Sequence, residues 1–162
     1  MTEKITMKTI QYIKGDATLP HAEGNKIIAH ICNDIGGWGK GFVTAISKRW
    51  KQPEQKYREW FKNRENFSLG EIQIVHTEED IWVCNMIAQH KIITHSSVPP
   101  IRYEAVEECL LKLSYEALQQ NASVHMPRIG CGLAGGKWEE IEPIIERTLL
   151  ANDVEVDVYD FG

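Results

Sequence analysis

Apolar and polar residues alternate near both ends of the chain, as they do in strands with one exposed face. Thr9–Lys14 alternates in this way and then stops at a Gly-Asp pair. Near the C-terminus, Val154, Val156 and Val158 alternate with acidic or aromatic neighbours. The pattern predicts a first strand and a last strand that are each half exposed.

Four other segments predict strands deeper in a sheet. Lys26–Cys32 is a continuous apolar run, typical of a central strand covered on both faces. Glu71–His76 and Ile81–Met86 flank the acidic turn at 78–80 and predict a strand pair. Ser123–Met126 predicts a short strand directly before a glycine-rich loop.

Helical periodicity fills the gaps between these strands. Phe42–Trp50 reads as one helix, a second follows Pro53, Arg102–Gln120 forms a long third and Glu139–Leu150 a fourth. The residues expected on the inner faces are Tyr57, Trp60, Phe61, Val106, Cys109, Leu110, Leu113, Ala117, Ile141, Ile144, Ile145 and Leu149.

The order of elements is β-β-α-α-β-β-α-β-α-β, which predicts an α/β fold with a mixed six-stranded sheet between two helical layers. The chain has 162 residues, of which 43% are hydrophobic. This length and composition suit one domain, residues 1–162, with a sizeable core. We therefore expect a three-layer α/β/α domain.

Composition excludes several classes of protein. No apolar run approaches the roughly 18–20 residues of a membrane span, and the N-terminal segment 1–8 lacks the apolar stretch of a secretion signal. We expect a cytoplasmic protein without membrane binding. A formal charge of −5 argues against general nucleic-acid binding.

Cysteines and histidines do not form a metal-binding pattern. The four cysteines are Cys32, Cys84, Cys109 and Cys131, and no Cys-x-x-Cys pair occurs among them, so we expect free thiols. His90 and His95 are five positions apart, which places them off a single helical face. We expect no bound metal and no cofactor.

Two glycine-rich loops carry the strongest chemical signal. Residues 36–41 and 130–136 each connect a predicted strand to a predicted helix. Glycines let backbone N–H groups approach a ligand, and a helix N-terminus adds partial positive charge. Two such anion sites in one small domain predict a ligand with two phosphates.

A nicotinamide-binding Rossmann domain is the obvious alternative. Its Gly-x-Gly-x-x-Gly motif follows the first strand, with an acidic residue about 20 positions on. Here the first glycine loop follows the second predicted strand and has the spacing Gly37-x-Gly39-x-Gly41. The sequence therefore does not favour a nicotinamide oxidoreductase.

Four motifs in the same order resemble those of the macro domain family, which binds ADP-ribose. They are 14–16 (KGD), 29–33 (AHICN), 126–133 (MPRIGCGL) and 156–161 (VDVYDF). The resemblance covers essentially the whole chain. It is strongest to the small branch that includes terminal ADP-ribose protein glycohydrolases and ADP-ribose-1''-phosphate phosphatases.

The resemblance implies a role for each matched position. Asp16 would accept a hydrogen bond from the adenine amine, although a plain turn residue fits as well. Phe161 would stack on adenine or pack against the core. Trp38 would cover the distal ribose as a lid or pack at the surface. The implied ligand-binding residues are Asp16, Asn33, Gly37, Trp38, Gly39, Gly41, Gly130, Cys131, Gly132, Leu133, Ala134 and Phe161.

Catalysis is less well specified by the resemblance. Glycohydrolase members use a lysine and an aspartate where this chain has Gln89 and Ala134. The phosphatase-like pattern implies His30 as the acid or base, with Asp34 orienting it or a water molecule. By default, however, a histidine in an apolar strand is a core residue. Cys131 would gain a lowered pKa at a helix N-terminus, but a structural role suits it better.

Two functions follow from the resemblance. The first is a metal-independent hydrolase that acts on a small ADP-ribose derivative, such as the 1''-phosphate or an ADP-ribosyl adduct. The second is a non-catalytic reader of ADP-ribose or ADP-ribosylated protein. Convergence of His30 and Asp34 on the distal ribose would favour the hydrolase, and burial of both in the core would favour the reader.

Overall fold

The computed structural model describes residues 8–92 and 98–161. Most of the N-terminal segment 1–8, on which the expectation about secretion rests, lies outside these ranges, as does His95. In the part of the chain that is described, no helix is long and apolar enough to cross a membrane. No group of three or more potential metal-binding side chains occurs there either.

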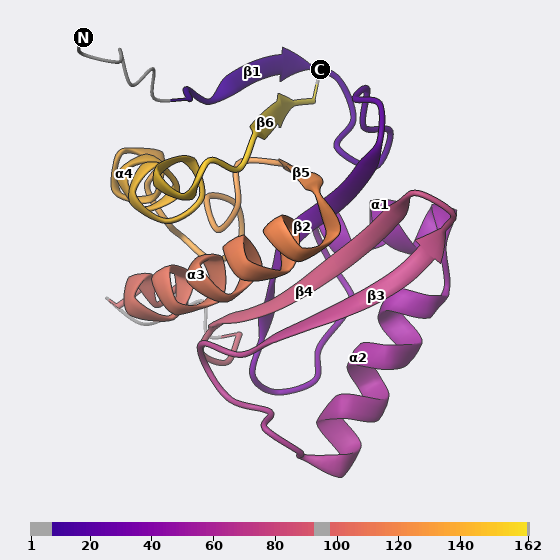
Figure 1. Cartoon of the computed structure of the whole chain (residues 1–162). Helices are drawn as coiled ribbons and strands as arrows, with labels where there is room; N and C mark the ends of the chain where they lie inside the picture. Colours follow the sequence, from indigo (N-terminus) through magenta and orange to yellow (C-terminus); the bar gives the residue numbers. More distant parts are fainter. Residues whose placement is uncertain (1–7, 93–97, 162) are drawn as a thin grey trace, which may run out of the picture.

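The expected sheet of six strands is confirmed, in the order β1-β6-β5-β2-β4-β3 (Figure 1). All neighbours pair in parallel except β3 and β4, which form the antiparallel hairpin expected from the acidic turn. The strands are β1 (Gln11–Lys14), β2 (Asn25–Asn33), β3 (Ile72–Glu78), β4 (Ile81–Gln89), β5 (Ala122–Met126) and β6 (Val156–Asp160).

Four α-helices cover the two faces of the sheet, α1 and α2 on one and α3 and α4 on the other (Figure 1). The expected α/β/α layering is therefore confirmed. The helices are α1 (Phe42–Arg49), α2 (Gln52–Asn63), α3 (Tyr103–Gln120) and α4 (Trp138–Thr148), followed by a short 3-10 turn, Leu150–Asn152.

The central strand β2 shows why the apolar run was continuous. Ile27 and Ala29 pack into the core beneath α3 and α4, whereas Ile28 and Cys32 pack into the core beneath α1 and α2. Because successive side chains point to opposite faces, a strand between two helical layers must be apolar at nearly every position. Within the apolar stretch Ile27–Cys32 of this strand, His30 is the polar exception.

Element boundaries differ from the expectation by a few residues. The first strand begins at Gln11 and the last at Val156, each two residues later than alternation suggested. Val154 is nevertheless buried in the core beneath α3 and α4, and its N–H donates to the carbonyl of Leu149, the residue just after α4. Val154 is apolar because it packs near the end of α4, and in the sequence this position looked like the start of the last strand.

Candidate functional site

A cleft lies beyond the carboxyl ends of the parallel strands, where ligands usually bind in sheets of this kind. It consists of two adjoining hollows of about 220 and 300 Å³. The first hollow lies between residues 40–43 and the loop 127–134. The second lies between the loop 37–40 and Gln89 and Ile92. The residues shared by both are Ile31, Lys40, Val43, Gln89 and Leu133.

Three consecutive backbone amides in the second glycine loop have no internal partner. The N–H groups of Gly132, Leu133 and Ala134 donate no hydrogen bond within the described part of the chain. The loop itself is held by Gly135 N–H to Gly132 O and by Gly136 N–H to Gly130 O, at 3.0 and 2.7 Å. Successive unpaired amides form an anion-binding nest, and this one lines the first hollow.

The N-terminus of α1 forms the opposite wall of the first hollow. Gly41, Phe42 and Val43 line it, and the helix has neither a side-chain cap nor an acidic residue in its first turn among the described residues. An uncapped N-terminus presents unsatisfied N–H groups and partial positive charge. Lys40 adds a cationic side chain at the same wall. The first hollow is therefore built for an anion.

Glycine at two cleft positions is required neither by backbone conformation nor by packing. A Cβ added to Gly39 or Gly132 would meet no protein atom within 4 Å, and neither residue has a positive φ. Gly130 differs, since its φ is +72° and a Cβ would lie 2.2 Å from Ile101 Cδ1. Both unconstrained glycines line the cleft, so their missing side chains keep space open for a ligand.

Asn33 organises the first glycine loop from the end of β2. Its Oδ1 accepts hydrogen bonds from the N–H groups of Ile35 and Gly37 and from the Tyr57 hydroxyl, and its Nδ2 donates to Gly37 O. The side chain is only 8% exposed although it lines the second hollow. Its polar atoms therefore shape the loop.

Trp38 is a buried wall of the second hollow, which rules out the surface position that was one of its two expected roles. The side chain is 6% exposed, and its Nε1–H donates to Ser47 Oγ at 2.8 Å. Its ring lies against Tyr57 and meets the edge of His30, with centroids 5.4 and 5.3 Å apart. The large aromatic in this glycine loop is explained by the core beneath α1 and α2.

His30 lies beneath the first hollow with one hydrogen-bonded nitrogen. Its Nε2 contacts Asn85 Oδ1 at 2.5 Å, and the Asn85 amide group donates to Pro53 O and Gln73 Oε1. Because that leaves the Asn85 oxygen facing the ring, Nε2 carries the proton and Nδ1 is an acceptor. Nδ1 is buried without a partner among the described residues. Burial lowers the pKa of His30 to about 4.

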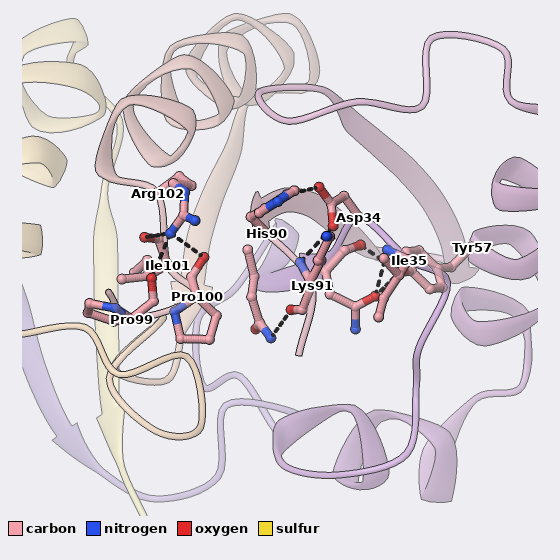
Figure 2. Close-up of polar contacts among 11 residues, drawn as sticks. Asp34, Ile35, Tyr57, His90, Lys91, Pro99, Pro100, Ile101 and Arg102 are labelled. Atoms are coloured by element: carbon pink, nitrogen blue, oxygen red, sulfur yellow. Dashed lines mark hydrogen bonds and ion pairs between the residues drawn. The ribbon is translucent and has the colours of Figure 1, made fainter. Parts of the chain in front are cut away.

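Asp34 does not orient His30, in contrast to the expected pairing. Its Oδ2 instead contacts His90 Nδ1 at 2.7 Å, and its Oδ1 accepts the Lys91 N–H at 2.7 Å (Figure 2). No pattern in the sequence pairs these residues, which follow β2 and β4 and are 56 positions apart. The signal that could have paired them is their position in the chain, because each residue comes directly after one of two adjacent parallel strands.

Asp16 and Phe161, the residues implied for adenine, lie beside each other in the fold but line neither hollow. Gly15 N–H donates to Asp160 O, which joins the end of β1 to the end of β6. Asp16 Oδ1 accepts hydrogen bonds from the N–H and hydroxyl of Thr18. Phe161 is 86% exposed, so it does not pack in the core.

Arg128 is an internal anchor at this end of the cleft. Its guanidinium forms a two-point ion pair with Asp160, at 2.6 and 3.1 Å, and lies over the Tyr12 and Trp138 rings. The neighbouring Cys131 fits the structural role that the sequence favoured for it. Burial raises its pKa, and α4 begins only at Trp138. Cys131 is therefore not an activated thiol at a helix N-terminus.

Solved structures of close similarity match nearly the whole chain. A protein of unknown function from Bacteroides thetaiotaomicron is 56% identical with a TM-score of 0.93, over 94% of this chain and 98% of that one. A macrodomain protein from Streptomyces coelicolor is 49% identical with a TM-score of 0.85, over 94% and 99% of the respective chains. A comparison with profiles of known families gives no match.

Curated relatives are more distant. The chromodomain-helicase-DNA-binding protein 1-like of Mus musculus is 31% identical over 98% of this chain. The chain spans less than a fifth of that relative and of its Danio rerio counterpart, 18% and 15%. An ADP-ribose 1''-phosphate phosphatase of Candida albicans is 27% identical, over 85% of this chain and 92% of the relative. With its cleft at the strand ends and a 49% identical macrodomain matched end to end, the chain belongs to the macrodomain family.

Proposed function

We propose that the chain binds ADP-ribose in this cleft. The observation that carries the proposal is the first hollow, where three unpaired amides of the second glycine loop and the uncapped N-terminus of α1 line one space. A diphosphate carries two anionic groups next to each other and matches two adjacent sets of N–H donors. Lys40 supplies a further positive charge.

The two ends of the ligand then have distinct surroundings. The distal ribose occupies the second hollow, beside Gly37, Gly39 and Gln89. The adenine extends toward the ends of β1 and β6, where Asp16 Oδ2 is free of hydrogen bonds to the described residues and Phe161 is exposed. An acceptor-only carboxylate and an open aromatic ring are suited to an adenine amine and an adenine face.

We further propose that the chain hydrolyses a group attached to the distal ribose, without a metal ion. The phosphatase relative from Candida albicans, aligned over most of both chains, supports this reaction class. Unpaired amides around the cleft would stabilise negative charge as the bond to the leaving group breaks. His30 lines the first hollow, and its buried Nδ1 is an acceptor without a partner among the described residues, suited to hold a hydroxyl or water by its proton if one reaches it.

A non-catalytic reader is the second candidate. Gln89 lines the cleft where glycohydrolase members carry a lysine, and Ala134 stands where they carry an aspartate. His30 is 2% exposed and is not paired with Asp34. A reader needs only the binding cleft, which is present, and the catalytic pair expected from the sequence, His30 with Asp34, does not form.

Calorimetric titration with ADP-ribose tests binding, and product analysis with ADP-ribose 1''-phosphate and an ADP-ribosylated peptide tests turnover. Micromolar binding with release of phosphate or ADP-ribose supports the hydrolase. Binding without release from either substrate makes the domain a reader. Absence of binding contradicts both candidates.

A further inference from the structure

His90 and Asp34 form an oriented pair that none of the roles above uses. Lys91 N–H fixes Oδ1 of the carboxylate while His90 Nδ1 contacts Oδ2, both at 2.7 Å (Figure 2). A carboxylate only accepts hydrogen bonds, so in the neutral ring Nδ1 carries the proton and Nε2 presents its lone pair. The His90 side chain is 40% exposed and that of Asp34 only 17%, so the ring reaches solvent above an enclosed carboxylate.

The pair lies at the edge of the second hollow. Asp34 directly follows Asn33, and His90 lies between Gln89 and Ile92 in the sequence; these three neighbours all line the hollow. Asp34 N–H donates to Gln89 O at 3.0 Å, which continues the β2–β4 pairing beyond the strand ends. His90 N–H donates to Pro100 O, so the ring is carried on a backbone fixed from both sides.

We propose that His90 is the general base of the hydrolysis, with Asp34 as its positioning residue. This inference rests on the proposed hydrolase function. His90 Nε2 takes a proton from a water molecule as the water oxygen bonds to the atom attacked, the anomeric carbon or the phosphorus. The bond from that atom to the leaving oxygen breaks, and its electron pair stays on that oxygen. The imidazolium then returns its proton to the leaving oxygen or to solvent.

The charged groups around the ring are few. Asp34 comes from the end of β2 and Lys91 is the next residue along the chain. Arg102, just before α3, donates hydrogen bonds to the carbonyl oxygens of Pro99, Pro100 and Ile101 (Figure 2). From α2, Tyr57 donates to Asn33 and not to the pair. Among the described residues, Asp34 is thus the charged group that forms a hydrogen bond with the His90 ring.

Two substitutions distinguish a catalytic base at His90 from a residue that only holds the backbone in place. His90→Asn retains an N–H that can donate to Asp34 and removes the basic nitrogen. Asp34→Asn offers one oxygen for two N–H donors, which turns the ring to the opposite tautomer. We expect either change to lower kcat by about 10²–10⁴-fold while KM and the affinity for ADP-ribose change less than about twofold. His76→Asn, on an exposed stretch of β3, is the matched control and should retain wild-type turnover.

The pH profile decides between the roles, measured with whichever of ADP-ribose 1''-phosphate and an ADP-ribosylated peptide the wild type cleaves. Wild-type turnover should fall at low pH as the base is protonated, and His90→Asn should lose that dependence. A His90→Asn enzyme with wild-type turnover and profile overturns the assignment and leaves the hydrolase proposal standing. Absence of wild-type turnover on both substrates overturns both, although ADP-ribose binding would survive. Independently of activity, ¹⁵N NMR must show the proton of neutral His90 on Nδ1, and a proton on Nε2 would contradict the proposal.

Discussion

At the residue scale, two glycines of one loop have different reasons to be glycine. Gly130 has a left-handed φ and a side chain there would clash with Ile101, whereas a side chain at Gly132 would enter the open cleft. A run of sequence such as GCGL cannot distinguish these cases, because both glycines are written with the same letter. The space around each Cα makes the distinction, and it leads to opposite consequences for substitution.

Gly132→Ala should weaken ADP-ribose binding and leave folding intact. The added methyl group narrows the space beside the unpaired amides, so we expect at least a tenfold loss of affinity, about 1.4 kcal/mol, with an unchanged Tm. Gly130→Ala should instead cost about 1–3 kcal/mol of stability. Calorimetry and thermal unfolding of both variants check this. Equal effects of the two changes on affinity and on Tm would contradict it.

His30 and His125 should make the protein lose stability as pH falls. Burial lowers the pKa of each to about 4, against an ordinary value of 6.5. The unfolded chain therefore binds more protons than the folded one between these values. The free energy of unfolding is therefore unaffected by these histidines above pH 6.5. It decreases as pH falls from 6.5 toward about 4, by about 1.4 kcal/mol per pH unit for each histidine.

Urea unfolding between pH 6.5 and 5 measures this slope. His30→Gln should remove about half of the histidine contribution. If the slope is the same in wild type and His30→Gln, protonation of His30 is not linked to folding.

At the element scale, the segment before α3 ties the two sides of the cleft together. Ile101 N–H donates to Ala134 O in the second glycine loop, and Pro100 O accepts from His90 N–H beyond β4. Arg102 holds this segment through three backbone carbonyls, those of Pro99, Pro100 and Ile101 (Figure 2). All three contacts come from one guanidinium nitrogen, Nη1, so the connection depends on where that nitrogen is held.

Arg102→Lys should loosen this connection. Because hydrogen bonds from charged groups contribute about 1.5–3 kcal/mol, we expect amide hydrogen exchange at Ile101 and His90 to accelerate by about tenfold or more. Arg147→Lys is the matched control, since Arg147 pairs with Glu107 between α3 and α4. Unchanged exchange at both amides in Arg102→Lys would show that the segment holds its position without the guanidinium.

At the scale of the whole molecule, the carboxyl ends of five parallel strands place every proposed ligand contact at one edge of the sheet. Ligand binding to this edge should stabilise the entire fold, since only the folded chain brings the two glycine loops together. At a concentration 100 times Kd, a ligand adds about 2.7 kcal/mol to the free energy of unfolding.

ADP should raise the Tm more than AMP at equal concentration, because the first hollow is built for more than one phosphate. Added salt should reduce the difference. Thermal shift measurements check this, with Gly132→Ala as the variant expected to lose the advantage of ADP. Equal shifts for ADP and AMP in the wild type would contradict the diphosphate assignment of the hollow.

The sequence by itself determined the order of strands and helices, the mixed α/β sheet and the two glycine loops. These features depend on local periodicity and on residues that are neighbours in the chain, as in the apolar run of β2 and the stripe of α3. The four motifs also pointed to the family to which the chain belongs. Boundaries at Val154 depended on a contact with a helix end and were therefore misjudged.

Only the tertiary structure decided which side chains act together. His30 meets Asn85 and Asp34 meets His90 because parallel pairing of β2 with β4 sets these residues side by side. Trp38 is buried because Ser47, Tyr57 and His30 surround it. Such partnerships join residues up to 56 positions apart, and sequence periodicity holds no information on strand register between distant segments.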